Sequence, residues 1–102
     1  MTFFHHVYFY PREDARPGDA DAIESLCRKH LAGIPGVLRI AVGRPAGTDR
    51  AVVDNGYLVA LLLEFEDAAA EGRYQEHPDH LAFVAESRPH WASVRVFDTV
   101  GR

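Results

Sequence analysis

A tyrosine and two histidines gather around one proline in the second half of the chain. Tyr74 is followed by His77-Pro78-Asp79-His80, and the apolar pair Phe83-Val84 comes next. An imidazole can remove a proton near neutral pH, and a phenol can stabilise a developing oxyanion by a hydrogen bond. Tyr74 and His80 therefore predict acid–base catalysis without a cofactor, with His80 as the base.

The expected place of His80 in a helix favours this role. Pro78 cannot continue a helix that contains Tyr74, because its ring would clash with the Tyr74 carbonyl. The chain should restart with His77 at the N-cap and Pro78 at the first helical position, which puts His80 in the first turn. Burial and the positive end of the helix dipole both disfavour imidazolium, so we expect the pKa of His80 below its usual value of about 6.5. A structural His80 that ties the helix break to the sheet is the competing interpretation.

The other reactive side chains predict less chemistry. His5 should face the same side of its strand as Val7 and Phe9. His5, His77 and His80 could ligate a metal, but Pro78 separates two of them and a single cysteine supplies no thiolate set, so we predict no metal site. That cysteine, Cys27, lies on the apolar face of a helix, where a thiol is usually inert.

These residues are positioned by elements that alternate in type. Strands are expected over 3–10, 37–43, 57–65 and 92–100. A first helix should start at Asp21, with Glu24 completing an acidic capping box, and stop before Gly33. A second helical region over 66–88 is broken at Pro78. The order β-α-β-β-α-β predicts an α+β, ferredoxin-like fold, with an antiparallel sheet and the helices on one face.

Length and composition limit the classes of function. The 102 residues form one domain, 1–102, and 47 % apolar with 25 % charged residues excludes disorder by composition. A net charge of −4 argues against a nucleic-acid partner. The longest apolar run, 57–63, is too short to span a bilayer, which takes about 20 residues, and the first ten residues resemble no secretory signal. We therefore predict a cytoplasmic domain with no membrane partner.

The second face of the sheet predicts a protein partner. Tyr8, Leu58, Leu62 and Phe97 should lie on the face away from the helices, and that surface is too apolar for water. A second copy of the chain would cover it, so a homodimer through the sheet is expected.

Six segments together carry a resemblance to a known family: His5-His6-Val7-Tyr8-Phe9, Gly33-Ile34-Pro35-Gly36, Val42-Gly43, Gly56-Tyr57, Phe65-Glu66 and Tyr74…His77-Pro78-Asp79-His80…Phe83-Val84. In order and spacing they resemble the stress-responsive dimeric A/B barrel (Dabb) family over nearly the whole chain. The resemblance implies a ferredoxin-like protomer whose sheet packs on that of a twin to form a dimeric α/β barrel. It implies no organic cofactor.

One branch of that family, olivetolic acid cyclase, closes a linear polyketide by an aldol condensation. The resemblance to it implies Tyr74 and His80 as a catalytic pair and His5 as a pocket histidine. Val59 and Cys27 stand where that branch has a histidine and a tyrosine, which puts the same reaction in doubt. The remaining pocket, for a small aromatic or polyketide-like ligand, would be lined by Phe9, Ile23, Cys27, Val59, Leu61, Leu63, Phe83, Trp91, Val94 and Val96.

Three functions stay open on the sequence. The first is an aldol-type cyclase or lyase that uses His80 and Tyr74. The second is a non-catalytic, stress-associated dimer in which these residues are structural. The third, a cofactor-free oxygenase, rests on analogy of fold alone. An open cavity that touches His5, Tyr74 and His80 would favour chemistry, whereas a filled core would favour the structural dimer.

Overall fold

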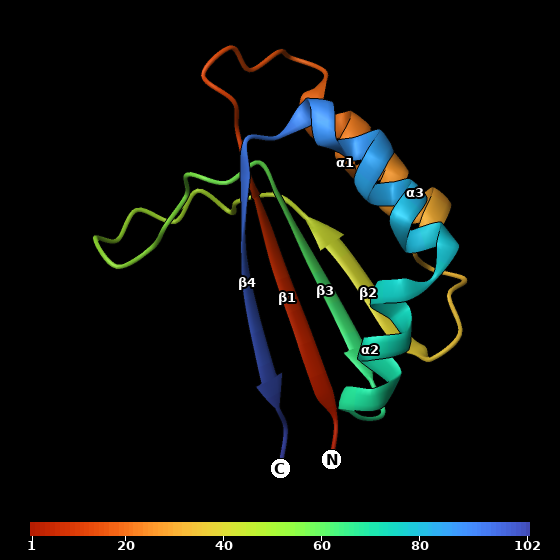
Figure 1. Cartoon of the computed structure of the whole chain (residues 1–102). Coiled ribbons are helices and arrows are strands. Elements are labelled where there is room, and N and C mark those ends of the chain that lie inside the picture. Colours follow the sequence, from red (N-terminus) through yellow and green to blue (C-terminus); the bar gives the residue numbers. More distant parts are fainter.

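One antiparallel sheet carries all helices on a single face. The computed structural model describes all 102 residues. The elements follow one another as β1 (Phe3–Tyr10), α1 (Asp19–His30), β2 (Val37–Gly43), β3 (Val59–Phe65), α2 (Ala68–Glu76), α3 (Pro78–Ser87), a short 3-10 helix (Arg88–His90) and β4 (Ser93–Val100). The strands lie in the order β2-β3-β1-β4 (Figure 1). The predicted ferredoxin-like α+β fold is confirmed.

The face toward the helices forms the apolar core. Side chains alternate along a strand, so His5, Val7 and Phe9 of β1 all point to this face and are buried, as predicted. Four residues of β3 alternate in the same way, and all are at most 1 % exposed: Val59, Leu61, Leu63 and Phe65. The α1 helix completes this layer with Ile23 and Cys27. Burial raises the pKa of the Cys27 thiol to about 12, which keeps it protonated and inert.

The start of α1 differs from the prediction. The helix begins at Asp19 behind Gly18, without a side-chain cap, so the expected capping box at Asp21 is wrong. Asp19 is buried and instead accepts hydrogen bonds from the Arg16 amide (2.8 Å) and from His90 Nδ1 (2.8 Å). These hydrogen bonds lower the pKa of its carboxyl group. Asp19 thereby joins the segment before α1 to the one before β4.

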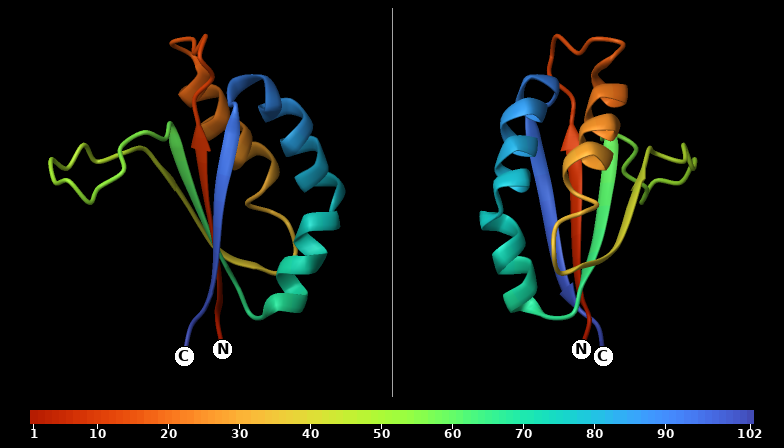
Figure 2. Two further views of the ribbon diagram at one scale, coloured as in Figure 1. Left: turned by 60° about the vertical axis from the view of Figure 1, so that its left-hand side comes forward. Right: turned by 90° about the vertical axis from the view of Figure 1, so that its right-hand side faces the viewer.

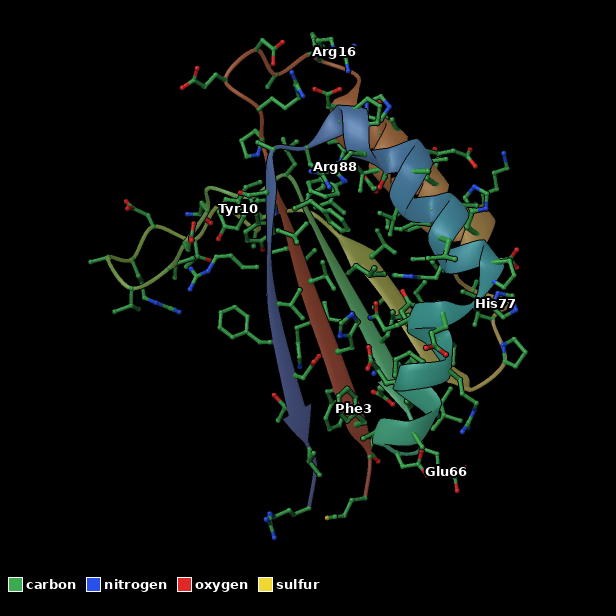
Figure 3. The ribbon with its side chains drawn as sticks, viewed as in Figure 1. Phe3, Tyr10, Arg16, Glu66, His77 and Arg88 are labelled. Atoms are coloured by element: carbon green, nitrogen blue, oxygen red, sulfur yellow. The ribbon has the colours of Figure 1, made fainter.

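The predicted helix break is confirmed. α2 ends at Glu76 and α3 begins at Pro78, with His77 as the cap between them. His77 Nδ1 accepts a hydrogen bond from the Asp79 amide at 3.1 Å. Figure 3 places His77 where the two helices meet.

The opposite face of the sheet has no covering layer (Figure 2). On this open face Leu62 is 38 % and Phe97 49 % exposed, and the Tyr8 ring packs edge-on against Phe97. Leu58, which was expected beside them, is partly buried and packs against the core instead. The loop 44–58 leaves the sheet on the open side and is fastened by a 2.8 Å hydrogen bond from Tyr10 to Asp54.

None of the helices has the length and apolar character that crossing a membrane requires.

Candidate active site

A cavity of about 220 Å³ lies between the sheet and the helices α2 and α3. It exists because α3 packs against α1 and α2 rather than directly on a strand, and reaches β1 through side chains such as Phe83. No helix packs on β4, where Val94 and Val96 are 38 % and 46 % exposed, so the cavity opens at this edge. Twelve residues line it: His5, Val7, Phe9, Leu61, Tyr74, Gln75, His80, Phe83, Val84, Trp91, Val94 and Val96.

The helix break fixes the orientation of His80. In an unbroken helix the Gln75 carbonyl would accept the amide of Asp79, but that amide bonds to His77 instead. The freed Gln75 oxygen lies 3.0 Å from His80 Nδ1. A carbonyl can only accept, so Nδ1 carries the proton and Nε2 keeps its lone pair. Burial lowers the pKa of His80, so the ring is neutral near pH 7 and Nε2 can act as a base.

Tyr74 lies directly beside this base. The two ring centroids are 4.7 Å apart, and both side chains line the cavity. Tyr74 is 1 % exposed, and burial raises the pKa of its phenol well above the usual range. The hydroxyl therefore stays protonated. A protonated phenol can donate a hydrogen bond to a ligand that enters the cavity.

His5 lies on β1 and contacts polar side chains of β4 and α2. Its Nδ1 lies 2.5 Å from Asp98 Oδ1 and 3.7 Å from Glu71 Oε2. Its Nε2 lies 3.5 Å from Gln75 Nε2, and its ring is 6.1 Å from that of Tyr74. The His5 side chain is thus held at both nitrogens while its ring lines the cavity.

Three residues of this group were not predicted. Asp98 follows Val94 and Val96 on the same face of β4, and an acid on an otherwise apolar face was the signal that could have indicated it. Glu71 and Gln75 gave no such signal, because polar residues in a short helix are ordinarily solvated. Their role depends on where α2 sits on the sheet.

The predicted site residues separate into two groups. His5, Tyr74 and His80 meet at one cavity with Phe9, Leu61, Phe83, Trp91, Val94 and Val96. The expectation that Ile23, Cys27, Val59 and Leu63 also line it is wrong, because α1 packs closely on the sheet and buries them in the filled core. The two departures from the cyclase pattern, Val59 and Cys27, therefore do not line this cavity. No group of three or more His, Cys, Asp or Glu side chains is arranged to hold a metal ion.

The single tryptophan should report on this cavity. Trp91 is 8 % exposed, its Nε1 donates to Ser87 Oγ at 3.1 Å, and its ring lines the cavity. We expect a blue-shifted fluorescence emission that changes when an aromatic ketone such as benzylacetone is titrated in. Trp91 is the single tryptophan and can be excited selectively at wavelengths that tyrosine does not absorb, so an emission maximum like that of free tryptophan, with no response to the ketone, would contradict this placement.

Comparison with known proteins places the chain among small barrel-forming domains. The family model described as "Stress responsive A/B Barrel Domain" matches residues 3–100. None of the curated proteins matches the chain in sequence. A Dabb family protein with a ferredoxin-like fold from Mesorhizobium loti is 27 % identical, with a TM-score of 0.78, over 99 % of this chain and 97 % of that one.

Two further solved structures are similar in fold. A dimeric ferredoxin-like protein of unknown function from Thermobifida fusca is 23 % identical, with a TM-score of 0.80, over 97 % of this chain and 90 % of that one. The hydroxynitrile lyase from Passiflora edulis is 19 % identical, with a TM-score of 0.79, over 99 % of this chain and 94 % of that one.

Proposed function

This chain belongs to the stress responsive A/B barrel domain family, and we propose that it is a cofactor-free acid–base enzyme of the lyase or aldol-cyclase type. One observation carries the proposal: the lone pair of His80 Nε2 and the protonated hydroxyl of Tyr74 belong to adjacent rings that line one apolar cavity. The fold it shares with the Passiflora hydroxynitrile lyase supports the class of reaction.

The cavity indicates a small carbonyl compound with an aromatic or short aliphatic body. Most lining side chains are apolar, and the four polar ones, His5, Tyr74, Gln75 and His80, lie next to one another. A volume of about 220 Å³ is smaller than the 300–1,000 Å³ typical of drug-sized ligands. One aromatic ring with a short ketone chain is therefore the substrate class that we propose.

Proton abstraction next to the carbonyl would start the reaction. His80 Nε2 takes the proton, the C–H electron pair moves into an enolate, and the Tyr74 O–H donates a hydrogen bond to the enolate oxygen. In an aldol closure, the enolate carbon then bonds to a second carbonyl carbon of the same substrate. The alkoxide that forms takes the proton back from the His80 imidazolium, so the base is regenerated and no cofactor is consumed.

Exchange of carbon-bound hydrogen tests this step without knowledge of the natural substrate. In D₂O the protein should catalyse deuterium incorporation next to the carbonyl of benzylacetone, measured by ¹H NMR. Tyr74→Phe keeps the ring but removes the donor and should reduce the rate by about 10²–10³-fold, as expected when one donor to an oxyanion is lost. A rate equal to that of buffer alone would exclude proton abstraction from this ketone.

The pH dependence of exchange should identify the base. His80 acts in its neutral form, and burial lowers its pKa, so the rate should rise with pH, reach half its maximum below pH 6.5, and stay level through neutrality. A rate that still rises above pH 8 would exclude His80 and point to a base with a higher pKa.

We further propose that the functional unit is a homodimer through the open face of the sheet. Leu62 and Phe97 expose apolar surface there, and the similar protein from Thermobifida fusca is described as dimeric. Two copies packed sheet to sheet would form the barrel that the family description names. Light scattering at micromolar concentration should give the mass of two chains.

A non-catalytic structural dimer is the second candidate. It is favoured by the hydrogen bonds that His5 and His80 already make to Asp98 and Gln75, as structural histidines would. Under this alternative, Tyr74→Phe and His80→Gln would lower stability without any catalysed exchange to lose.

A further inference from the structure

We propose that Gln75 is a positioning residue that sets which ring nitrogen carries the proton on both histidines of the candidate active site. The inference deepens the proposed function and rests on it, because it explains how His5 as well as His80 would present Nε2 as a proton acceptor. Gln75 does this in two ways, through its main-chain carbonyl and through its side-chain amide.

The side-chain amide has a fixed orientation. Glu71 Oε2 lies 2.7 Å from Gln75 Nε2 and, as a carboxylate oxygen, can only accept. The NH₂ end of Gln75 must therefore face Glu71. Glu71 is one turn earlier on α2 and its side chain is 13 % exposed, so the contact is well shielded from water.

This orientation determines the chemistry that the amide offers to His5. The same NH₂ group lies 3.5 Å from His5 Nε2, and a donor at that place calls for a lone pair on Nε2. At the other nitrogen, the Asp98 carboxylate can only accept, so Nδ1 carries the proton. Glu71, Gln75, His5 and Asp98 thus form a directional chain in which every donor meets an acceptor.

A second proton on His5 would disrupt this chain. Protonated Nε2 would meet the NH₂ donor of Gln75, and turning the amide around would set its oxygen against Glu71. The charged and titratable groups around His5 are Asp98 on β4, Glu71 and Tyr74 on α2, and His80 on α3. Asp98 and Glu71 offer only acceptors, so among these neighbours it is Gln75 whose donor requires a lone pair on Nε2.

The main-chain part of the role concerns His80. The Gln75 carbonyl accepts from His80 Nδ1 at 3.0 Å, which leaves Nε2 free. Substitution of the Gln75 side chain cannot remove this carbonyl. His80 is therefore an internal control in any variant of position 75.

Gln75→Glu tests the inference because it replaces the donor with an acceptor at nearly constant shape. Long-range ¹H–¹⁵N NMR should show that the neutral form of wild-type His5 carries its proton on Nδ1. In Gln75→Glu we expect His5 to gain a second N–H, while His80 keeps its proton on Nδ1 alone. Gln75→Met, which removes the donor without adding charge, should give an intermediate share of doubly protonated His5.

Arg73→Gln is the matched control for charge. It makes the same change in net charge on the exposed side of α2 and should leave His5 as in the wild type.

The outcomes separate this inference from the proposed function. If His5 is in the same protonation state in wild type and Gln75→Glu, or if wild-type His5 carries its proton on Nε2, the role of Gln75 is overturned even when exchange is observed. If His5 responds as expected but no variant catalyses exchange, the positioning role stands and the proposed function fails.

Discussion

Replacing His80 with glutamine is expected to lower catalysed exchange of benzylacetone by about 10²–10⁴-fold, the usual contribution of a positioned general base. Glutamine can still donate to the Gln75 carbonyl, so the helix break keeps its contact while the basic Nε2 is lost. The rate is measured by ¹H NMR in D₂O at pH 7. Circular dichroism before and after heating checks that the variant folds.

His77→Asn is the control for this substitution. It removes the other imidazole of the break, three residues from His80, yet asparagine is a good N-cap and can still accept from the Asp79 amide. It should retain most of the exchange. An activity loss in His77→Asn equal to that in His80→Gln would show that the break matters only as structure.

Leu62→Glu should convert the dimer to monomers. Leu62 is 38 % exposed in the protomer, so glutamate can be solvated there without unfolding the chain. In a two-fold dimer the change occurs twice, and burial of each leucine stabilises by about 1.5–3 kcal/mol. We therefore expect the dissociation constant to rise about 100-fold or more, measured by analytical ultracentrifugation over a concentration series.

The matched control is Leu81→Glu on α3. Leu81 is 57 % exposed on the helical layer, so the same substitution there should leave the mass unchanged. If Leu62→Glu and the wild type both have the mass of two chains, the dimer forms through another surface. A wild-type protein of one chain at micromolar concentration would exclude the proposed dimer itself.

The architecture of the site was largely predictable because local rules determine it. The alternation of β1 placed His5 on the helical face, and the clash of the Pro78 ring with the Tyr74 carbonyl predicted the break that puts His80 in a first helical turn. Tyr74 and His80 were therefore expected to be close, and their rings are 4.7 Å apart. Tyr74 and His80 are only six positions apart, so local structure alone is enough to predict their contact.

The extent of the cavity was not predictable in the same way. The periodicity of α1 and β3 correctly placed Ile23, Cys27 and Val59 between the helices and the sheet. It could not tell that α1 lies close to the sheet while α3 stands away from it, and this difference decides which apolar residues are packed and which line open space. The Asp98 partner of His5 likewise depends on the register of β1 against β4, which pairs these two residues across 93 positions of sequence.

Pro78 also links the helix break to the position of one proton. Alanine at this position would restore an N–H and remove the proline ring, so α2 and α3 could join in one ladder of main-chain hydrogen bonds. The same ladder would occupy the Gln75 carbonyl, so His80 would lose the partner that holds its proton on Nδ1. Pro78 does not line the cavity, so a residue outside the site would determine, through the main chain, which nitrogen of the base carries its proton.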